Sequence, residues 1–146
     1  MGLKELLAEN RLEQRATSAQ EIQDLLKVAS RGLQDASVKQ LSLDGRFNFA
    51  YDAALVLATI PLRCAGYRTR GEGHHVMVFD LLSEIMGKSL ETTARYLQKC
   101  RKIRNMSTYS RSGIVSQAEV DDLISHAEQF YTEVSRWIKD HYPKCS

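Results

Sequence analysis

The most unusual chemistry in the sequence is a run of cations near residue 100. The segment Thr92–Ala118 contains no Asp or Glu, but it contains six basic residues: Arg95, Lys99, Arg101, Lys102, Arg104 and Arg111. A guanidinium group presents a planar fork of donors that suits phosphate and carboxylate. We therefore expect this acid-free segment to bind an anionic partner. The alternative is a solvent-exposed basic cap, because cations at a helix C-terminus also offset the helix dipole.

One carboxylate lies within a mostly apolar stretch that has no other charged residue. Asp52 is the only charged residue between Phe47 and Leu62. A buried carboxylate is strongly unfavourable unless it is paired, and the acid-free segment is the obvious source of a partner. The sequence thus predicts that Arg101 or Arg104 lies beside Asp52. The alternative is that Asp52 occupies a narrow exposed strip of its helix.

Neither the cysteines nor the histidines have the spacing of a metal site. Cys64, Cys100 and Cys145 lie far apart in the chain, with no Cys-x-x-Cys pair, so we expect reduced thiols. On a helix the adjacent His74 and His75 point about 100° apart, and no third ligand follows at helical spacing. We expect neither a metal nor another cofactor.

Helices must position these residues, because apolar residues recur every three or four positions almost everywhere and no run alternates as a strand does. Ser18 and Ser116 each precede a Glu by three residues, which is the spacing of an N-terminal capping box. Asp44 and Ser89 are the expected N-caps of two further helices. The expected helices span about 3–15, 19–37, 45–65, 74–86, 90–109 and 117–142.

The expected fold class is all-α: an up-and-down antiparallel bundle of four main helices, plus a short N-terminal helix and an inserted short helix. The stretch Phe47–Ile60 has few polar residues, so its helix should form the buried centre, and Leu55→Asp should unfold the protein. We expect one domain over residues 1–146, with an N-terminal extension helix at 1–16 and the bundle at 17–142.

Length and composition exclude several classes of protein. The chain has 146 residues, 43% of them hydrophobic, and a formal net charge of +2. These values are typical of a single soluble domain, and the charge is too small to require a nucleic-acid partner. No stretch approaches the ~20 apolar residues that span a bilayer, and residues 1–15 are charged throughout. We expect a cytoplasmic protein that does not contact a membrane.

Four short motifs, in their order and spacing, resemble those of the HEPN superfamily of small helical bundles. They are Leu25-Leu26-x-x-Ala29-x-x-x-Leu33-x-x-Ala36, Ala50-Tyr51-Asp52-Ala53-Ala54, Gly73-His74-His75 and Arg104-Asn105-x-x-x-Tyr109. The resemblance covers most of the chain after the N-terminal extension. It implies a bundle that commonly dimerises, with the Arg-Asn motifs of both chains meeting in one cleft. It also implies contact with a nucleotide or RNA.

The sequence departs from the active HEPN ribonucleases at one position. Those enzymes carry Arg followed four to six residues later by His, whereas Tyr109 follows Arg104 and no His lies between Arg101 and Ser125. An unperturbed Tyr titrates near pH ~10 and is a poor base at neutral pH, so we expect no ribonuclease activity. The residues expected to bind an anion or nucleotide are Arg101, Lys102, Arg104, Asn105 and Tyr109. The residues expected to support them are Asp52, Tyr51 and His75.

The same resemblance implies partners. Some relatives pair with a nucleotidyltransferase in toxin–antitoxin or defence modules, where a Tyr near the motif is the modified group, and Tyr109 is the candidate here. Our leading interpretation is a non-catalytic, homodimeric bundle that binds a nucleotide, RNA or a protein partner. Two alternatives stay open. One is a divergent, metal-independent ribonuclease in which another group replaces the missing His, and the other is a purely structural interaction module.

Overall fold

The computed structural model describes the backbone of residues 2–109 and 113–146, and the side chains of residues 2–106 and 113–146. Within these residues the elements are α1 (Leu3–Ala8), β1 (Leu12–Gln14), α2 (Ala19–Ala36), α3 (Leu43–Cys64), β2 (Tyr67–Thr69), α4 (His74–Asp80), α5 (Leu82–Met86), η1 (Lys88–Leu90), α6 (Glu91–Tyr109), α7 (Gln117–His141) and η2 (Pro143–Cys145). Most of these elements are helices, which confirms the all-α expectation. Over the described residues, no helix combines the length and the apolar character needed to cross a membrane.

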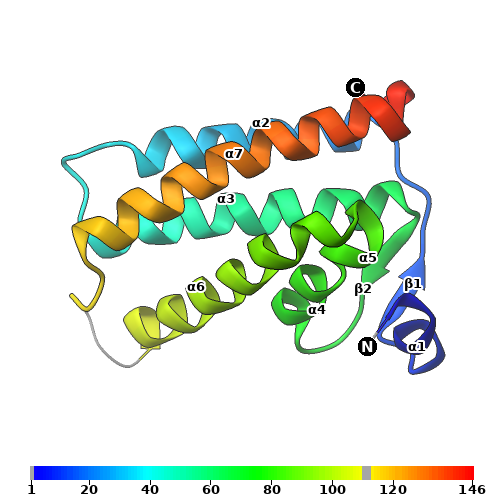
Figure 1. Ribbon diagram of the computed structural model, residues 1–146, viewed down its shortest axis with the longest axis horizontal. Helices are drawn as coiled ribbons and strands as arrows, with labels where there is room; N and C mark the ends of the chain where they lie inside the picture. Colours follow the sequence, from blue (N-terminus) through cyan, green and yellow to red (C-terminus); the bar gives the residue numbers. More distant parts are fainter. Residues whose placement is uncertain (1, 110–112) are drawn as a thin grey trace.

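Four long helices form the expected antiparallel bundle. In Figure 1, α2, α3, α6 and α7 run alternately in opposite directions, and α3 lies between α2 and α7 on one side and α6 on the other. The short helices α4 and α5 pack against both α3 and α6 near the start of α6. The N-terminal α1 and the strands lie at the end of the bundle where α3 finishes.

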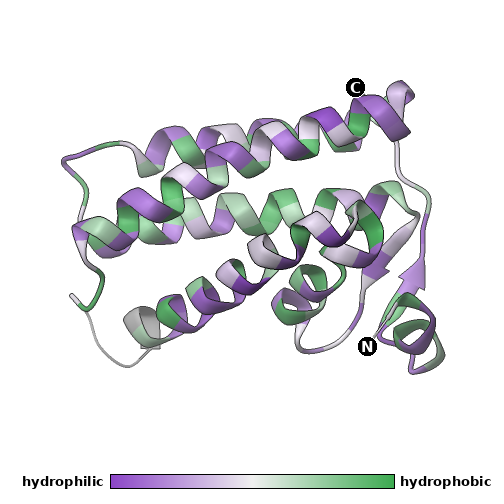
Figure 2. Ribbon diagram, in the orientation of Figure 1, coloured by the Kyte–Doolittle hydropathy of each residue, from purple (hydrophilic) through white to green (hydrophobic). Residues whose placement is uncertain are grey.

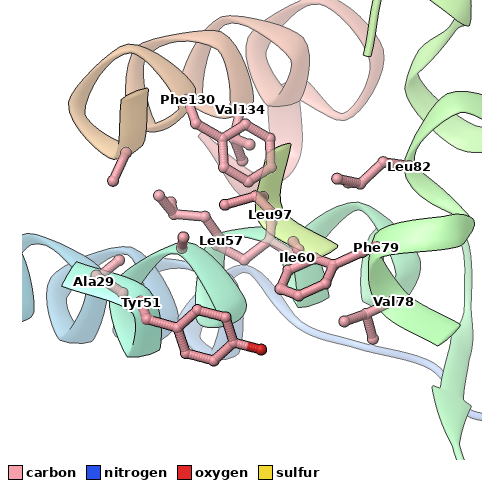
Figure 3. Close-up of a cluster of buried hydrophobic side chains, with 14 of the residues drawn as sticks. Ala29, Tyr51, Leu57, Ile60, Val78, Phe79, Leu82, Leu97, Phe130 and Val134 are labelled. Carbon is pink, nitrogen blue, oxygen red and sulfur yellow. The ribbon is translucent and has the colours of Figure 1, made fainter. Parts of the chain in front are cut away.

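The core is built around α3, which is buried along nearly its whole length. Figure 3 shows Phe79 of α4, Leu97 of α6 and Phe130 of α7 gathered around Leu57 and the other apolar side chains of α3. Figure 2 colours α3 mostly green and white, whereas α2 and α7 alternate between green and purple along their lengths. This central place is the one expected for a helix that is apolar on most of its faces.

Leu55 of α3 packs against the core but is less buried than the sequence predicted. Leu55 is only partly buried, while Leu57 is fully buried. A helix turns about 100° per residue, so even a mostly buried helix keeps one strip near the surface. On α3 that strip contains Phe49, Asp52 and Leu55, which follow one another at steps of three residues.

Serine hydroxyls cap the long helices where the sequence pattern is unambiguous. Ser18 and Ser116 cap α2 and α7 as expected, and each accepts the backbone N–H of the residue three positions later. The expected cap at Asp44 is wrong, because the Ser42 hydroxyl accepts the N–H of Gly45 at 3.0 Å. Two capping residues lie two positions apart here, and the local pattern alone does not choose between them.

The N-terminal extension is not a single helix. The helix α1 ends at Ala8, Asn10 adopts a left-handed φ of 61°, and β1 pairs antiparallel with β2, with Leu12 opposite Thr69. Strands of three residues are too short to show alternation, and the partner strand lies far along the chain, so no local pattern indicated this pair. Leu6 and Leu12 are each 2% exposed, so the extension packs against the bundle.

The inserted helix is also divided. The expected helix at 74–86 consists of α4 and α5, which meet at the buried residue Leu81. The short helix η1 then leads directly into α6. Ser89 lies inside η1, so the prediction that it caps a long helix is wrong.

Replacing Leu57 by Ala should destabilise the fold strongly. Leu57 is 0% exposed, and truncating a fully buried Leu leaves a cavity, so the free energy of unfolding should fall by about 2–5 kcal/mol in a urea titration. Leu41→Ala is the matched control, because Leu41 is 40% exposed, and it should change that free energy by less than about 0.5 kcal/mol. Equal losses in the two variants would contradict the central place of α3.

Candidate functional site

The predicted ion pair between the acid-free segment and α3 is confirmed. Arg104 of α6 places Nη1 at 3.3 Å from Oδ1 of Asp52. The physical reason given for this pair was wrong, however, because the Asp52 side chain is 54% exposed and the Arg104 side chain 24%. Asp52 occupies the exposed strip of α3. An ion pair this exposed contributes at most about 1 kcal/mol to stability, so its main effect is to orient the guanidinium.

Tyr51 joins this ion pair to α4. Its ring is fully buried, and the guanidinium carbon of Arg104 lies 5.1 Å from the ring centroid, within cation–π distance. The Tyr51 hydroxyl forms a 2.9 Å hydrogen bond with Nδ1 of His75, in which the donor depends on the tautomer of His75. Figure 3 shows the Tyr51 ring at the edge of the apolar cluster, where core and polar site meet. Asp52, Arg104, Tyr51 and His75 thus form one connected group.

The surroundings of Tyr51 and His75 keep both side chains uncharged at neutral pH. Burial raises the pKa of Tyr51 above its ordinary value. Burial, followed by the charges of His74 and Arg104, lowers the pKa of His75 below 6.5. A neutral His75 beside a protonated Tyr51 requires no counter-ion, which suits a site that is partly closed to water.

Arg101 is fixed by a residue that the sequence pattern did not single out. The Nε–H of Arg101 donates to Oε1 of Gln98 at 2.9 Å, and the Gln98 amide donates to Oδ1 of Asp80 at 2.9 Å and to the backbone oxygen of Val76 at 3.1 Å. Gln98 therefore ties Arg101 to α4 as well as to α6. The sequence does contain a signal for the contact between Gln98 and Arg101: they are three residues apart, a spacing that brings two side chains together on a helix.

Two of the remaining predicted binding residues do not join this group. Lys102 and Asn105 are exposed. On a helix, Lys102 points about 160° away from Arg104, so it lies on another face of α6. The side chain of Tyr109 lies outside the described residues. The described part of the site is therefore centred on Arg101 and Arg104.

The acids of α7 do not neutralise these two arginines. Within the described side chains, no ion pair joins Arg101, Lys102 or Arg104 to the acids at the start of α7, which are Glu119, Asp121 and Asp122. Glu119 and Asp122 instead line a small cavity together with Lys99. Asp52 is thus the carboxylate that lies against the basic end of α6.

The other residues considered for chemistry have local roles. His74 forms a short hydrogen bond with the Thr69 hydroxyl, and the cysteines at 64, 100 and 145 are free. Over the described residues, no three His, Cys, Asp or Glu side chains come together as a metal site.

Comparison with known proteins adds no name to this site. No family model, no curated protein and no solved structure matches the chain. The HEPN resemblance therefore stays a prediction based on its motifs. What can be said about function depends on the geometry around Arg101 and Arg104.

Removing the positive or the negative charge beside His75 should shift the pKa of His75 in opposite directions. Arg104 lowers the pKa of His75 and Asp52 raises it, so Arg104→Gln should raise that pKa and Asp52→Asn should lower it further. The measurement is an NMR titration of the imidazole Cε1–H resonance. Lys88→Gln removes a charge from η1, outside this group, and is the control that should leave the pKa unchanged. Shifts of the same sign in both site variants would contradict the arrangement.

Proposed function

We propose that this chain is a HEPN-like, non-catalytic bundle that binds the phosphate groups of a nucleotide or of RNA through the basic end of α6. The observation that supports this most directly is the positioning of Arg101 and Arg104. They lie one turn apart on α6, and each is held by a side chain next to it. Guanidinium groups that are already oriented lose less conformational entropy when they bind an oxyanion.

The contacts already present leave both arginines able to bind. A guanidinium carries five N–H donors, and Gln98 takes only the Nε–H of Arg101. The Asp52 carboxylate is more than half exposed, so solvent screens its attraction for Arg104. The several phosphate charges of a nucleotide or of an RNA backbone compete well against one screened carboxylate.

One observation favours the ribonuclease alternative as a second candidate. His75 is linked to Arg104 through Tyr51, so a histidine lies near the arginine although none follows it closely in the sequence. Its lowered pKa leaves it neutral at pH 7, as a general base must be. We rank binding first because the fully buried Tyr51 stands between His75 and Arg104 and occupies Nδ1 of the imidazole.

We also propose that two copies of the chain associate through the groove between α2 and α3. Val28 and Phe49 line this groove and are 50% and 40% exposed. Arg31 and Asp35 line it as well, so each copy presents both signs of charge, as a twofold self-complementary interface requires. Asp52 borders the same groove, and pairing of two grooves would bring both Arg104 side chains toward one cleft.

A further part of the proposal depends on the HEPN resemblance alone. A nucleotidyltransferase partner, as in toxin–antitoxin or defence modules, would modify Tyr109. Mass spectrometry of the chain purified after co-expression with such an enzyme tests this, and a nucleotide adduct on Tyr109 is the supporting result.

Removing the two site arginines should abolish polyanion binding. Arg101→Gln with Arg104→Gln should weaken binding of a short, mixed-sequence single-stranded RNA at least tenfold, because two oriented phosphate-binding groups are lost. The logarithm of the wild-type affinity should fall linearly with the logarithm of salt concentration. The measurement is fluorescence anisotropy of labelled RNA, repeated with ATP as competitor.

The matched control is Arg136→Gln with Lys139→Gln. These cations have the same spacing of three residues, but they lie on the exposed face of α7. This control should retain wild-type affinity. Affinity that does not depend on salt, or that survives loss of Arg101 and Arg104, would refute the binding site. RNA turnover that disappears in both Arg104→Ala and His75→Gln would replace the proposal with the ribonuclease alternative.

The self-association can be tested with a second matched pair. Phe49→Glu should convert a dimer to a monomer in sedimentation velocity, because it places a charge in the centre of the proposed interface. Leu41→Glu is the control, since Leu41 is also 40% exposed but does not line the groove, and it should remain dimeric. A wild-type chain that is monomeric at all concentrations would contradict the interface.

A further inference from the structure

A second group of cations lies at the other end of the bundle. Arg15, Arg63 and Arg68 line a cavity of about 240 Å³, which we call the arginine pocket, together with Glu13, Thr59 and His74. Arg15 directly follows β1, Arg63 is in the last turn of α3, and Arg68 is in β2. Along α3, Arg63 lies about 16 Å from Asp52, at 1.5 Å per residue. The arginine pocket is thus separate from the site around Arg104.

One donor of the partly buried Arg63 side chain is buried without a hydrogen-bond partner among the described residues. Its Nε–H is fully buried and has no hydrogen-bond partner in the described part of the chain. Its Nη1 reaches only to 3.8 Å from Glu21 Oε1. Glu21 is already committed, because Arg68 Nη2 contacts its Oε2 at 2.5 Å and the Thr17 hydroxyl donates to its Oε1 at 2.7 Å. Leaving a buried donor unpaired is unfavourable, so a ligand that accepts a hydrogen bond from the Arg63 Nε–H would be stabilised there.

The charges around the pocket also remain unbalanced. Three guanidinium groups face two carboxylates, Glu13 and Glu21. Burial, followed by repulsion from Arg68, lowers the pKa of Arg63. Burial and then Arg63 lower the pKa of His74, so His74 is neutral at pH 7 and adds no compensating or opposing charge. An anion in the pocket would relieve the repulsion and supply the missing acceptor.

The size and lining of the cavity select the kind of anion. Pockets for drug-sized ligands run from about 300 Å³ upward, so about 240 Å³ accommodates one phosphate group but not a whole nucleotide. Guanidinium groups offer only donors, and the charged oxygens of phosphate are acceptors in a geometry that matches the planar fork. We propose that the arginine pocket binds the phosphate group of a small molecule between Arg63 and Arg68.

The test begins with the wild-type chain and inorganic phosphate as the probe. The Nε–H resonance of Arg63 should move saturably in ¹⁵N NMR spectra as phosphate replaces chloride at constant ionic strength. Because Nε–H is the unpaired donor, it should shift more than the same resonance of Arg136 on the exposed face of α7. Absence of a saturable shift, or an equal shift at Arg136, would overturn the proposal.

Variants of Arg63 then test whether this residue is responsible for the phosphate affinity. Arg63→Gln should raise the phosphate dissociation constant at least tenfold, and Arg63→Lys should raise it as well, because Lys keeps the charge but loses the fork. Lys27→Gln is the matched control, since it removes one exposed cation from α2 and should leave phosphate affinity unchanged. Circular dichroism and the melting temperature in phosphate-free buffer establish that each variant is folded. Unchanged affinity in folded Arg63→Gln would overturn the proposal.

Two further measurements separate the pocket from the RNA-binding proposal. The variant lacking Arg101 and Arg104 should keep the phosphate-induced shift of Arg63, and Arg63→Gln should keep RNA affinity. Loss of the shift in the first variant would mean that phosphate binds at α6 and would overturn the pocket. Competition between phosphate and RNA at Arg63 would assign the pocket to the RNA backbone, and would overturn the assignment to a small molecule.

Discussion

Burial of α3 on almost every side is the constraint on which the rest of the structure depends. Alanines at 50, 53, 54 and 58 make α3 thin enough for neighbouring helices to approach it closely. A Cβ atom added at Gly32 of α2 would come within 3.2 Å of the Cβ of Ala53, so the two helices are in tight contact. The other three long helices bury their apolar faces against this central helix. A helix without a clear apolar stripe can therefore form the centre of the bundle.

This central place also determines where chemistry is possible. The side chains of α3 reach the surface along one strip and at both ends of the helix, and the two basic clusters lie at that strip and at the C-terminal end. Tyr51 and Asp52 hold Arg104 through a ring face and a carboxylate. Arg63 lies where the helix ends, beside the small sheet and the start of α2. The two clusters share a scaffold but no side chain.

Local charge separation gives this nearly neutral chain its two basic regions. The formal net charge is only +2, yet Arg104 of the acid-free segment pairs with one exposed carboxylate, while Glu119 and Asp122 of α7 line a separate small cavity with Lys99. In the site around Arg104, uncharged groups share in positioning the cations: Gln98 orients Arg101, and the Tyr51 ring supports Arg104 beside the exposed Asp52 carboxylate. An uncharged support positions an arginine without cancelling its charge, which is what a phosphate-binding site requires.

The sequence by itself determined the features that depend on local spacing. The four long helices follow from apolar residues that recur with helical period, and the caps at Ser18 and Ser116 follow from a Glu three positions later. The burial of α3 follows from its scarcity of polar residues. The contact of Asp52 with Arg104, which are more than fifty positions apart, was also predicted from the scarcity of charge on α3. The sequence named the right partner, but the expected burial of Asp52 was wrong, because the exposure of its side chain depends on which strip of α3 the neighbouring helices leave uncovered.

Only the tertiary structure decided what distant segments do to one another. The pairing of β1 with β2, the outward position of Leu55 and the contact of Gln98 with Asp80 depend on the rotation and offset of packed elements, which no local period specifies. The same holds for Arg15, Arg63 and Arg68, whose side chains line one cavity although they come from three separate parts of the chain. Their convergence is set by how the end of α3 packs against the two-stranded sheet, and that packing is a property of the whole fold.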